Sequence, residues 1–421
     1  MTNSGCRLTT LGEIAEFING GAWNQSEYSA EGVPVVRVSD IRNETVDLSD
    51  CKFLPRSSLA KYEKHLLKAG DLVICTVGSH PTQPGSVVGR AAVIPESADS
   101  TLLNQNAVRL RSCSADVDQA WLGYLGRSRK FHDYIISCAR GSANQVRMAI
   151  GLLKEMRVEM PPFSVQRRIA GILSAYDDLI DNNQRRIKIL EEMARLLYRE
   201  WFVNFRFPGH ENVPLVDSPL GPIPRGWKVK SVRECIEIDP RVSVPREGEK
   251  PFVPMGSLAN NSMLITGIEA RNGNNGSKFQ NGDTLFARIT PCLENGKTGF
   301  VQFLPNEKTV GCGSTEFIVL RSRTLTPEFV YCLSRSEEFR GNAIKSMTGA
   351  SGRQRVQAQC FDRFFIPEPL PSLLNQFSAV VAPAFRLIQN LYLQTQNLRK
   401  TRDLLLARLV SSDLEVPIPC T

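Results

Sequence analysis

The chain has 421 residues, 42% of them hydrophobic and 22% charged, which is typical of an ordinary globular protein with two or three domains. No apolar run approaches the roughly 18 residues of a membrane span, and the polar N-terminus lacks a signal-peptide core, so a cytoplasmic protein is expected. Eleven scattered cysteines without a C-x-x-C pair predict reduced thiols, and the net charge of +8 permits a polyanionic partner without requiring one.

Residues 1–160 form the first predicted domain, an α/β globule. Short runs rich in Val, Ile and Leu, such as Val33–Val38 and Leu72–Val77, are separated by Gly, Pro, Asn and Ser. This texture predicts strands joined by turns. One helical segment is expected near Asp118–Cys138.

Residues 161–206 form a predicted spacer helix with a heptad seam. Its apolar positions alternate in steps of three and four, interrupted only by Asn183. The seam positions are Leu173, Tyr176, Ile180, Asn183, Ile187, Leu190, Ala194, Leu197 and Trp201. A helix from Ser164 to Phe205 would be about 60 Å long at ~1.5 Å per residue.

Residues 207–226 are dense in Pro and Gly and are interpreted as a linker without regular structure. The pair Gly226-Trp227 opens the second predicted domain, residues 227–370.

The second domain repeats motifs of the first, in the same order and displaced by about 210 residues. Its expected elements include a strand at Phe317–Leu320 and a helix near Pro327–Met347. The repeated motifs are Lys68–Ile74 with Gln280–Phe286, Gly89–Val93 with Gly299–Val301, Gly141–Val146 with Gly349–Gln354, and Pro161–Gln166 with Pro371–Gln376. The order and constant offset indicate a tandem duplication rather than a solenoid.

Residues 371–412 form a second predicted spacer helix, followed by a tail at 413–421. Pro383 is expected to start, kink or shorten this helix. Its seam positions are Phe377, Val381, Ala384, Ile388, Leu391, Thr395, Leu398, Arg402, Leu405 and Leu409. Two seams in one chain predict an antiparallel coiled coil; the alternative is that each helix lies separately on its own domain. The predicted fold is α+β, with two α/β domains separated by this helix pair in a pseudo-twofold tandem duplication.

Motifs of catalysis are missing from the sequence. Met160-Pro161-Pro162-Phe163 has the shape of an amino-methyltransferase loop without its Asn or Asp acceptor, and it reads more simply as the start of a helix. Asp50-Cys51-Lys52 is an isolated approach to a nuclease triplet. The four histidines, His65, His80, His132 and His210, share no metal-ligand spacing, and neither a P-loop nor G-x-S-x-G is present. We therefore expect no enzyme activity, metal or cofactor in this chain.

Side chains suited to reading DNA gather in the predicted loops. Asn and Gln pair with adenine and Arg with guanine, while Ser and Thr bind phosphates. The DNA-contact candidates are Arg37, Ser39, Thr76, Arg90, Asn104, Gln105, Asn106, Ser142, Asn144, Gln145, Arg147, Arg288, Thr290, Lys297, Ser314, Thr315, Ser351, Arg353, Gln354 and Arg355. The alternative for each is that it builds a turn.

The duplicated series resembles the specificity subunits of type I restriction–modification enzymes over the whole chain. The resemblance is carried by the turns Gly70-Asp71 and Gly282-Asp283, the two Gly…Gln loops, the two Pro-rich helix starts and the linker end Ile223–Trp227. The chain departs from the family at Gln166–Arg168 and Asn375–Phe377, where Glu-Gln is common.

This resemblance implies a non-catalytic subunit that binds double-stranded DNA, with each domain reading one half of a bipartite, asymmetric target. It implies that the helices set the spacing and dock two modification subunits, which bind S-adenosylmethionine and methylate adenine. Restriction subunits would add ATP- and Mg-dependent translocation and cleavage. Two other hypotheses are a duplicated protein-interaction scaffold that never touches DNA and a stand-alone methyltransferase, which would need a cofactor site that the sequence does not show.

Overall fold

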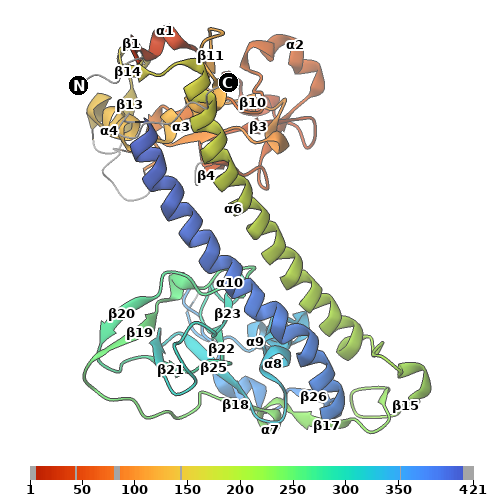
Figure 1. The fold of residues 1–421 in the computed structure, drawn as a ribbon. Helices are drawn as coiled ribbons and strands as arrows, with labels where there is room; N and C mark the ends of the chain where they lie inside the picture. The colour runs from red at the N-terminus through yellow and green to blue at the C-terminus, as the bar shows by residue number, and fades with distance from the viewer. Residues whose placement is uncertain (1–5, 43–44, 80–85, 143–144, 351, 411–421) are drawn as a thin grey trace. The chain divides into compact units, whose positions relative to one another are not determined.

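The computed structural model describes residues 6–42, 45–79, 86–142, 145–350 and 352–410. The chain divides into two units, residues 1–179 with 397–421 and residues 180–396. Each unit contains one sheet-rich domain and a segment of each of two long helices, α6 (Phe163–Tyr198) and α10 (Pro371–Val410) (Figure 1).

The first unit is built around an antiparallel sheet in the order β2-β11-β7-β9. Strand β7 is buried at all four positions, as its unbroken apolar sequence predicts. The sheet strands are β2 (Ala15–Asn19), β11 (Ala107–Ser112), β7 (Leu72–Cys75) and β9 (Ala91–Val93). A second sheet has β10 (Leu102–Leu103) parallel to β3 (Val33–Val36), which pairs with β6 (Lys52–Leu54). The short helix α1 (Leu11–Ile14) follows β1 (Arg7–Thr10), which pairs with β14 (Arg157–Met160).

The second unit repeats the central four-stranded sheet and the parallel strand pair of the second sheet, which confirms the duplication. Its central sheet has the order β18-β25-β22-β23, with strands β18 (Ile236–Ile238), β25 (Phe317–Ser322), β22 (Thr284–Ala287) and β23 (Thr298–Phe300). Its second sheet has the order β20-β19-β24-β21, with strands β20 (Glu269–Asn272), β19 (Glu249–Val253), β24 (Gly311–Gly313) and β21 (Ser277–Phe279). Strand β17 (Lys228–Ser231) pairs with β26 (Phe365–Glu368), and α7 (Val232–Cys235) corresponds to α1.

Each predicted domain helix is a pair of helices broken at a serine. Helices α3 (Gln119–Arg127) and α4 (Arg129–Cys138) meet at Ser128, and α8 (Pro327–Arg335) and α9 (Glu337–Lys345) meet at Ser336. Both serines have extended backbone, and each hydroxyl accepts a hydrogen bond from a backbone N–H three residues on. A serine N-cap stabilises such a restart because it satisfies an N–H that the helix itself leaves unpaired.

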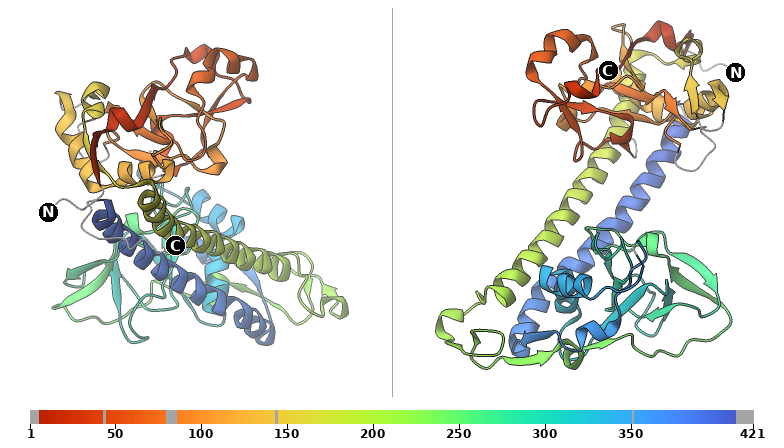
Figure 2. Two further views of the ribbon diagram at one scale, coloured as in Figure 1. Left: turned by 45° about the horizontal axis from the view of Figure 1, so that its top comes forward. Right: turned by 180° about the vertical axis from the view of Figure 1, so that it is seen from behind.

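The two long helices pair in opposite directions within each unit (Figure 2). In the first unit Leu173 of α6 shares a core with Leu406 and Leu409 of α10. In the second unit the Tyr198 and Phe377 rings lie 6.5 Å apart. Early residues of α6 thus contact late residues of α10, and the reverse. Every predicted seam position is buried or half-buried, so the antiparallel seam is confirmed.

The structure contradicts two expectations: that Pro383 starts or shortens the second long helix, and that residues 207–226 lack regular structure. Pro383 lies inside α10, which runs unbroken for 40 residues, against 36 for α6. Pro383 is exposed, so its ring faces away from the seam while buried neighbours such as Val381 and Phe385 hold the helix. Residues 207–226 are not irregular throughout, because β15 (Leu215–Val216) pairs with β16 (Ile223–Pro224), whose Ile223 is buried in the second-unit core.

The continuation of α6 also differs from the expected single helix to Phe205. After Tyr198 the chain forms a π-helical turn, Arg199–Val203, which carries the buried ring of Phe202 into the second-unit core. The ten cysteines in the described ranges are not joined in disulfides. Among the helices that the structure describes, none is long and apolar enough to cross a membrane.

Candidate nucleic-acid interface

The repeated Gly-Asp turns are structural anchors. Gly70 and Gly282 have φ of 86° and 90°, a left-handed conformation that glycine adopts without strain. The Asp71 carboxylate is buried and accepts two hydrogen bonds from Arg111, at 2.7 and 2.6 Å. Asp283 and Arg321 repeat this arrangement at 2.8 and 2.7 Å. Burial raises the pKa of Asp283, opposed by the Arg321 hydrogen bonds. The strongest repeated motif therefore holds each sheet together rather than reading a ligand.

The repeated glutamine at the start of the long helices has different roles in the two units. The Gln166 amide is fully buried; it accepts from Asp118 N–H at 2.8 Å and donates to the carbonyls of Asp116 and Pro161. It thereby fixes the start of α3 to the start of α6. Gln376 is exposed. The sequence repeat alone therefore did not show that Gln166 is a buried structural residue while Gln376 lies on the surface.

Two equivalent turns carry predicted DNA contacts. Asn104, Gln105 and Asn106 lie between β10 and β11, and Ser314 and Thr315 lie between β24 and β25. Gln105 and Thr315 are exposed at the tips, whereas the Ser314 hydroxyl accepts from Glu316 N–H at 3.2 Å. Each turn precedes a central strand, so its tip side chain is carried on a rigid support.

The first Gly…Gln motif is a hairpin. Strands β12 (Ala139–Ser142) and β13 (Gln145–Met148) pair with each other, and β13 also pairs with β8 (Val77–Gly78). Ser142 and Gln145 lie at its two strand ends, and Arg147 is exposed on β13. Asn144 lies outside the described residues.

The second Gly…Gln loop is held by several of its own predicted contact residues. The Thr290 hydroxyl accepts from Gln354 N–H at 3.1 Å, and Thr290 N–H donates to the Gln354 carbonyl at 3.0 Å. The Arg355 guanidinium binds Glu316 through bonds of 2.7–3.0 Å. Arg353 is exposed between these anchors. Ser351 lies outside the described residues.

Other predicted contacts are engaged within the fold. Arg37 donates to Asp40 at 3.0 and 2.8 Å, which raises the pKa of Arg37, and Ser39 donates to the same carboxylate. Arg90 donates to the carbonyls of Ile41 and Ser86. Lys297 donates to the Met255 carbonyl at 3.3 Å, and Thr76 is buried. These positions support the loops, and the structure does not gather them into one surface cluster.

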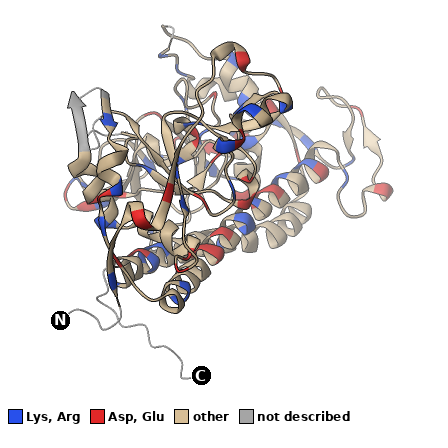
Figure 3. Cartoon of the chain, turned by 90° about the horizontal axis from the view of Figure 1, so that it is seen from above, with Lys and Arg blue, Asp and Glu red and all other residues tan. Residues whose placement is uncertain are grey.

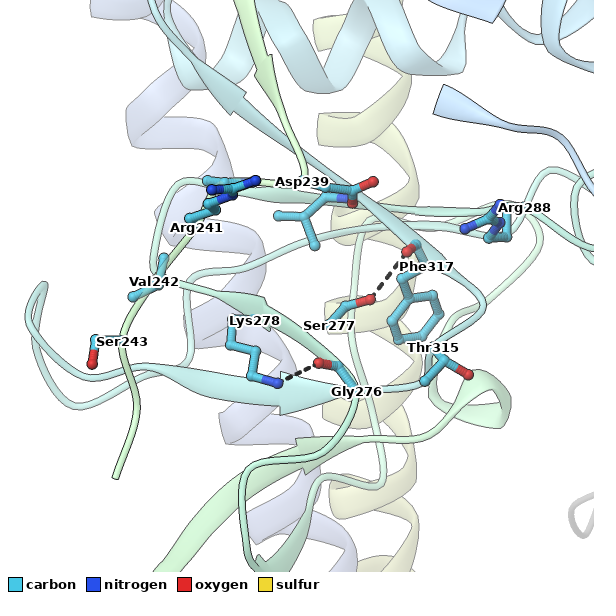
Figure 4. Close-up of a pocket in the computed structure, with 12 residues that line it drawn as sticks. Asp239, Arg241, Val242, Ser243, Gly276, Ser277, Lys278, Arg288, Thr315 and Phe317 are labelled. Atoms are coloured by element: carbon cyan, nitrogen blue, oxygen red, sulfur yellow. Dashed lines mark hydrogen bonds between the residues drawn. The ribbon is translucent and has the colours of Figure 1, made fainter. Parts of the chain in front are cut away.

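A pocket of about 670 Å³ in the second unit contains cations that the sequence analysis missed (Figure 4). Arg241 and Lys278 line it together with Arg288 and Thr315, which were predicted. The Asp239 carboxylate accepts from Val319 N–H at 2.9 Å, and burial raises its pKa. No motif marks Arg241 or Lys278; the fold brings them together from separate loops and strands.

The charged surface elsewhere is mixed. Figure 3 shows basic and acidic residues interspersed, including along the long helices. Within the described ranges, no three His, Cys, Asp or Glu side chains are grouped to hold a metal ion.

The first domain is fastened to both long helices by Asp177. Its carboxylate accepts from Tyr124 Oη at 2.7 Å and Arg127 Nη1 at 2.9 Å of α3, and from Arg402 Nη1 at 2.7 Å of α10. Burial alone would raise the pKa of Asp177, but the hydrogen bonds from the two arginines and Tyr124 outweigh it and lower the pKa of this carboxyl from its ordinary value. Arg402, a polar residue of the seam, therefore links α10 to α6 through its ion pair with Asp177.

In the second unit Glu191 fastens α6 to the domain. It accepts from Ser262 Oγ at 2.6 Å and Met263 N–H at 2.8 Å, while burial raises its pKa. The opposite face of α6 exposes Ile189, Met193 and Leu196, with 59%, 54% and 37% of each side chain accessible. Their spacing of four and three residues places them on one side of the helix.

Comparison with known proteins agrees with this architecture. Residues 3–192 match the model of the type I restriction modification DNA specificity domain. The chain is 24% identical over 388 residues to the type I restriction enzyme MjaIX specificity subunit of Methanocaldococcus jannaschii, covering 87% of each chain. It is 30% identical over 169 residues to the EcoAI specificity subunit of Escherichia coli, covering 38% of this chain and 28% of that one.

A solved structure of the S subunit of a type I restriction–modification system from M. genitalium has the same fold. The TM-score is 0.58 at 13% identity, over 97% of this chain and 98% of that chain. Residues 3–192 therefore carry the sequence pattern of the type I restriction modification DNA specificity domain, and the whole chain is similar to a type I specificity subunit in sequence and to an S subunit in fold.

Proposed function

We propose that this chain selects the DNA sequence for a type I restriction–modification complex, with each unit reading one half of a bipartite, asymmetric target. The observation that carries the proposal is the duplicated scaffold with unequal loops. The same central strands and Gly-Asp anchors recur in both units, but the side chains presented at equivalent places differ, as with Gln105 and Thr315. Different side chains on one scaffold select different bases.

The long helices supply the second part of the proposal, docking of two modification subunits. The exposed apolar face of Ile189, Met193 and Leu196 supports this, because an apolar stripe on a helix is stabilised by covering it. Its residues lie away from the seam, so a partner can bind without opening the helix pair.

In this proposal the methylation and cleavage reactions are carried out by the partner subunits. S-adenosylmethionine would bind to the modification subunits, and ATP with Mg to restriction subunits; this chain contributes sequence choice and no catalytic residue. The complex would work in the cytoplasm on double-stranded DNA.

The test is expression of the chain with and without its modification subunits, followed by adenine methylation of a duplex library randomised in both halves. We expect a stable complex that methylates one bipartite sequence. A complex that forms but neither binds nor methylates DNA in a sequence-dependent way would instead favour the interaction scaffold.

A further inference from the structure

We propose that the pocket beside β18 in the second unit is a clamp for the phosphodiester backbone of DNA, formed by Arg241, Lys278 and Arg288. The inference rests on the proposed function and adds to it a site, a ligand group and an asymmetry between the two units. Figure 4 shows the three side chains around one hollow, arriving from the loop after β18, from β21 and from the end of β22.

The donors of this pocket are available. Lys278 Nζ donates one hydrogen bond, to the Gly276 carbonyl at 2.6 Å, and an ammonium has three donors. Arg288 is held by Nε to the Val356 carbonyl and by Nη2 to Gln357 Oε1, and these bonds do not use Nη1. Arg241 is exposed, and in the part of the chain that the structure describes no hydrogen bond or ion pair holds it.

The charge balance favours an anion. Three cations face a single carboxylate, Asp239, whose Oδ1 already accepts from Val319 N–H. An anchored arginine beside two less constrained cations suits phosphate oxygens, which accept from any direction and carry no sequence information. Base reading would instead require side chains fixed in a bidentate geometry, and Lys278 is a point-charge donor without that geometry.

The first unit lacks this clamp at the corresponding positions. In the central sheets, the pair Ala287↔Phe317 corresponds to Cys75↔Ala107, so Arg288 corresponds to Thr76. The pair Ile238↔Leu320 corresponds to Phe17↔Leu110, so Arg241 corresponds to Gly20. Thr76 is buried. A Cβ on Gly20 would lie 1.9 Å from the Asn104 carbonyl oxygen, so no side chain fits there. At these two positions the first unit therefore offers no cation to a phosphate.

The experiment compares the complete complex of this chain and its modification subunits with complexes carrying Arg241→Ala, Lys278→Ala or both. Binding to a duplex with the target found by library methylation is measured against salt concentration. Each lost phosphate contact lowers the slope of log affinity against log salt by about one. An about fourfold rise in salt should then weaken each single variant about four times less than the wild type.

Two controls make the result specific. Lys308→Ala removes an exposed lysine of the same unit outside the pocket and should leave the slope nearly unchanged. Arg241→Lys keeps the charge and should retain the wild-type slope. The methylated sequence should be the same for every variant.

If Arg241→Ala and Lys278→Ala both show the wild-type slope of log affinity against log salt, the clamp proposal is overturned. Altered base preference in one half-site would also overturn it, because the residues would then read sequence. A wild-type complex without any sequence-dependent binding is a different result; it would remove the proposed function itself, and the clamp with it.

Discussion

Arg353 and Arg355 lie two positions apart in one loop, and their surroundings separate their roles. Arg355 donates to Glu316 through Nε and Nη2, and these hydrogen bonds raise the pKa of Arg355. Arg353 is exposed on a backbone fixed by Thr290 and Gln354. An exposed guanidinium on an immobilised loop is suited to bidentate contact with guanine, so we propose Arg353 as a base-reading residue of the second unit.

Arg353→Ala should weaken discrimination in one half-site by about 1–3 kcal/mol, the contribution of one bidentate base contact. Thermal stability should be unchanged, as for Arg363→Ala, which removes another exposed arginine of this unit. Gln145→Ala should relax the other half-site only, and the two losses should add because the residues belong to separate units. Methylation of the doubly randomised library measures both, and equal relaxation of both halves by either variant would contradict independent reading.

The Gly-Asp anchor carries a different prediction. Asp71→Asn should lower the free energy of unfolding by about 3 kcal/mol, the lower end for a broken buried pair. The lower end applies because the Arg111 side chain keeps 27% of its surface exposed, against 2% for Asp71. Asp133→Asn, which removes a largely exposed ion pair with Arg129, should cost at most about 1 kcal/mol. Urea unfolding of the full chain measures the difference; similar values for the two variants would show that Asp71 is not an anchor.

At the scale of elements, one carboxylate, that of Asp177, joins α6 to both α3 and α10. Asp177 binds two arginines whose side chains are about nine-tenths buried. Removing the charge of Asp177 leaves both guanidiniums with fewer acceptors where water reaches them poorly. Breaking a buried ion pair in this way is strongly destabilising, because the remaining charges stay buried without compensation.

Asp177→Asn should therefore lower the unfolding free energy by about 3 kcal/mol near neutral pH. The pKa of Asp177 is depressed in the folded chain, so its contribution is complete above the unfolded pKa and is lost as pH falls through the folded value. The difference between wild type and variant should shrink below about pH 4. Unfolding at several pH values tests this against Asp178→Asn, an exposed neighbour on the same helix; a pH-independent difference would contradict the ionic role.

At the scale of the whole molecule, α6 and α10 each contribute a segment to both units, and the unit boundaries fall after Leu179 and after Gln396. Buried seam residues occur on either side of each boundary, Leu173 and Ile180 in α6 and Leu391 and Arg402 in α10. The helix pair is thus the connection through which the proposed spacing of the half-sites would be set.

One extra heptad after Leu179 and one after Gln396, both continuing the seam, would lengthen the pair by about 10 Å at ~1.5 Å per residue. We expect the preferred gap between half-sites to grow by about three base pairs at ~3.4 Å each, with unchanged half-site sequences. A heptad in only one helix is the control, because it breaks the antiparallel register. Altered half-site bases in the doubly extended chain would contradict the spacer role.

The duplication, the strand runs, both seams and the resemblance to specificity subunits can be predicted from the sequence alone, because they are periodic or repeated patterns that do not depend on geometry. Which polar side chains are exposed for a ligand depends on the folded structure. Arg37, Arg90 and Arg355 resemble Arg353 in type, but they are hydrogen-bonded within the fold. Arg241 and Lys278 are 37 positions apart without a shared motif, and only sheet packing brings them to one pocket. The type of each side chain is given by the sequence. Whether that side chain is available to bind a ligand depends on neighbours that are distant in the sequence and close in the folded chain.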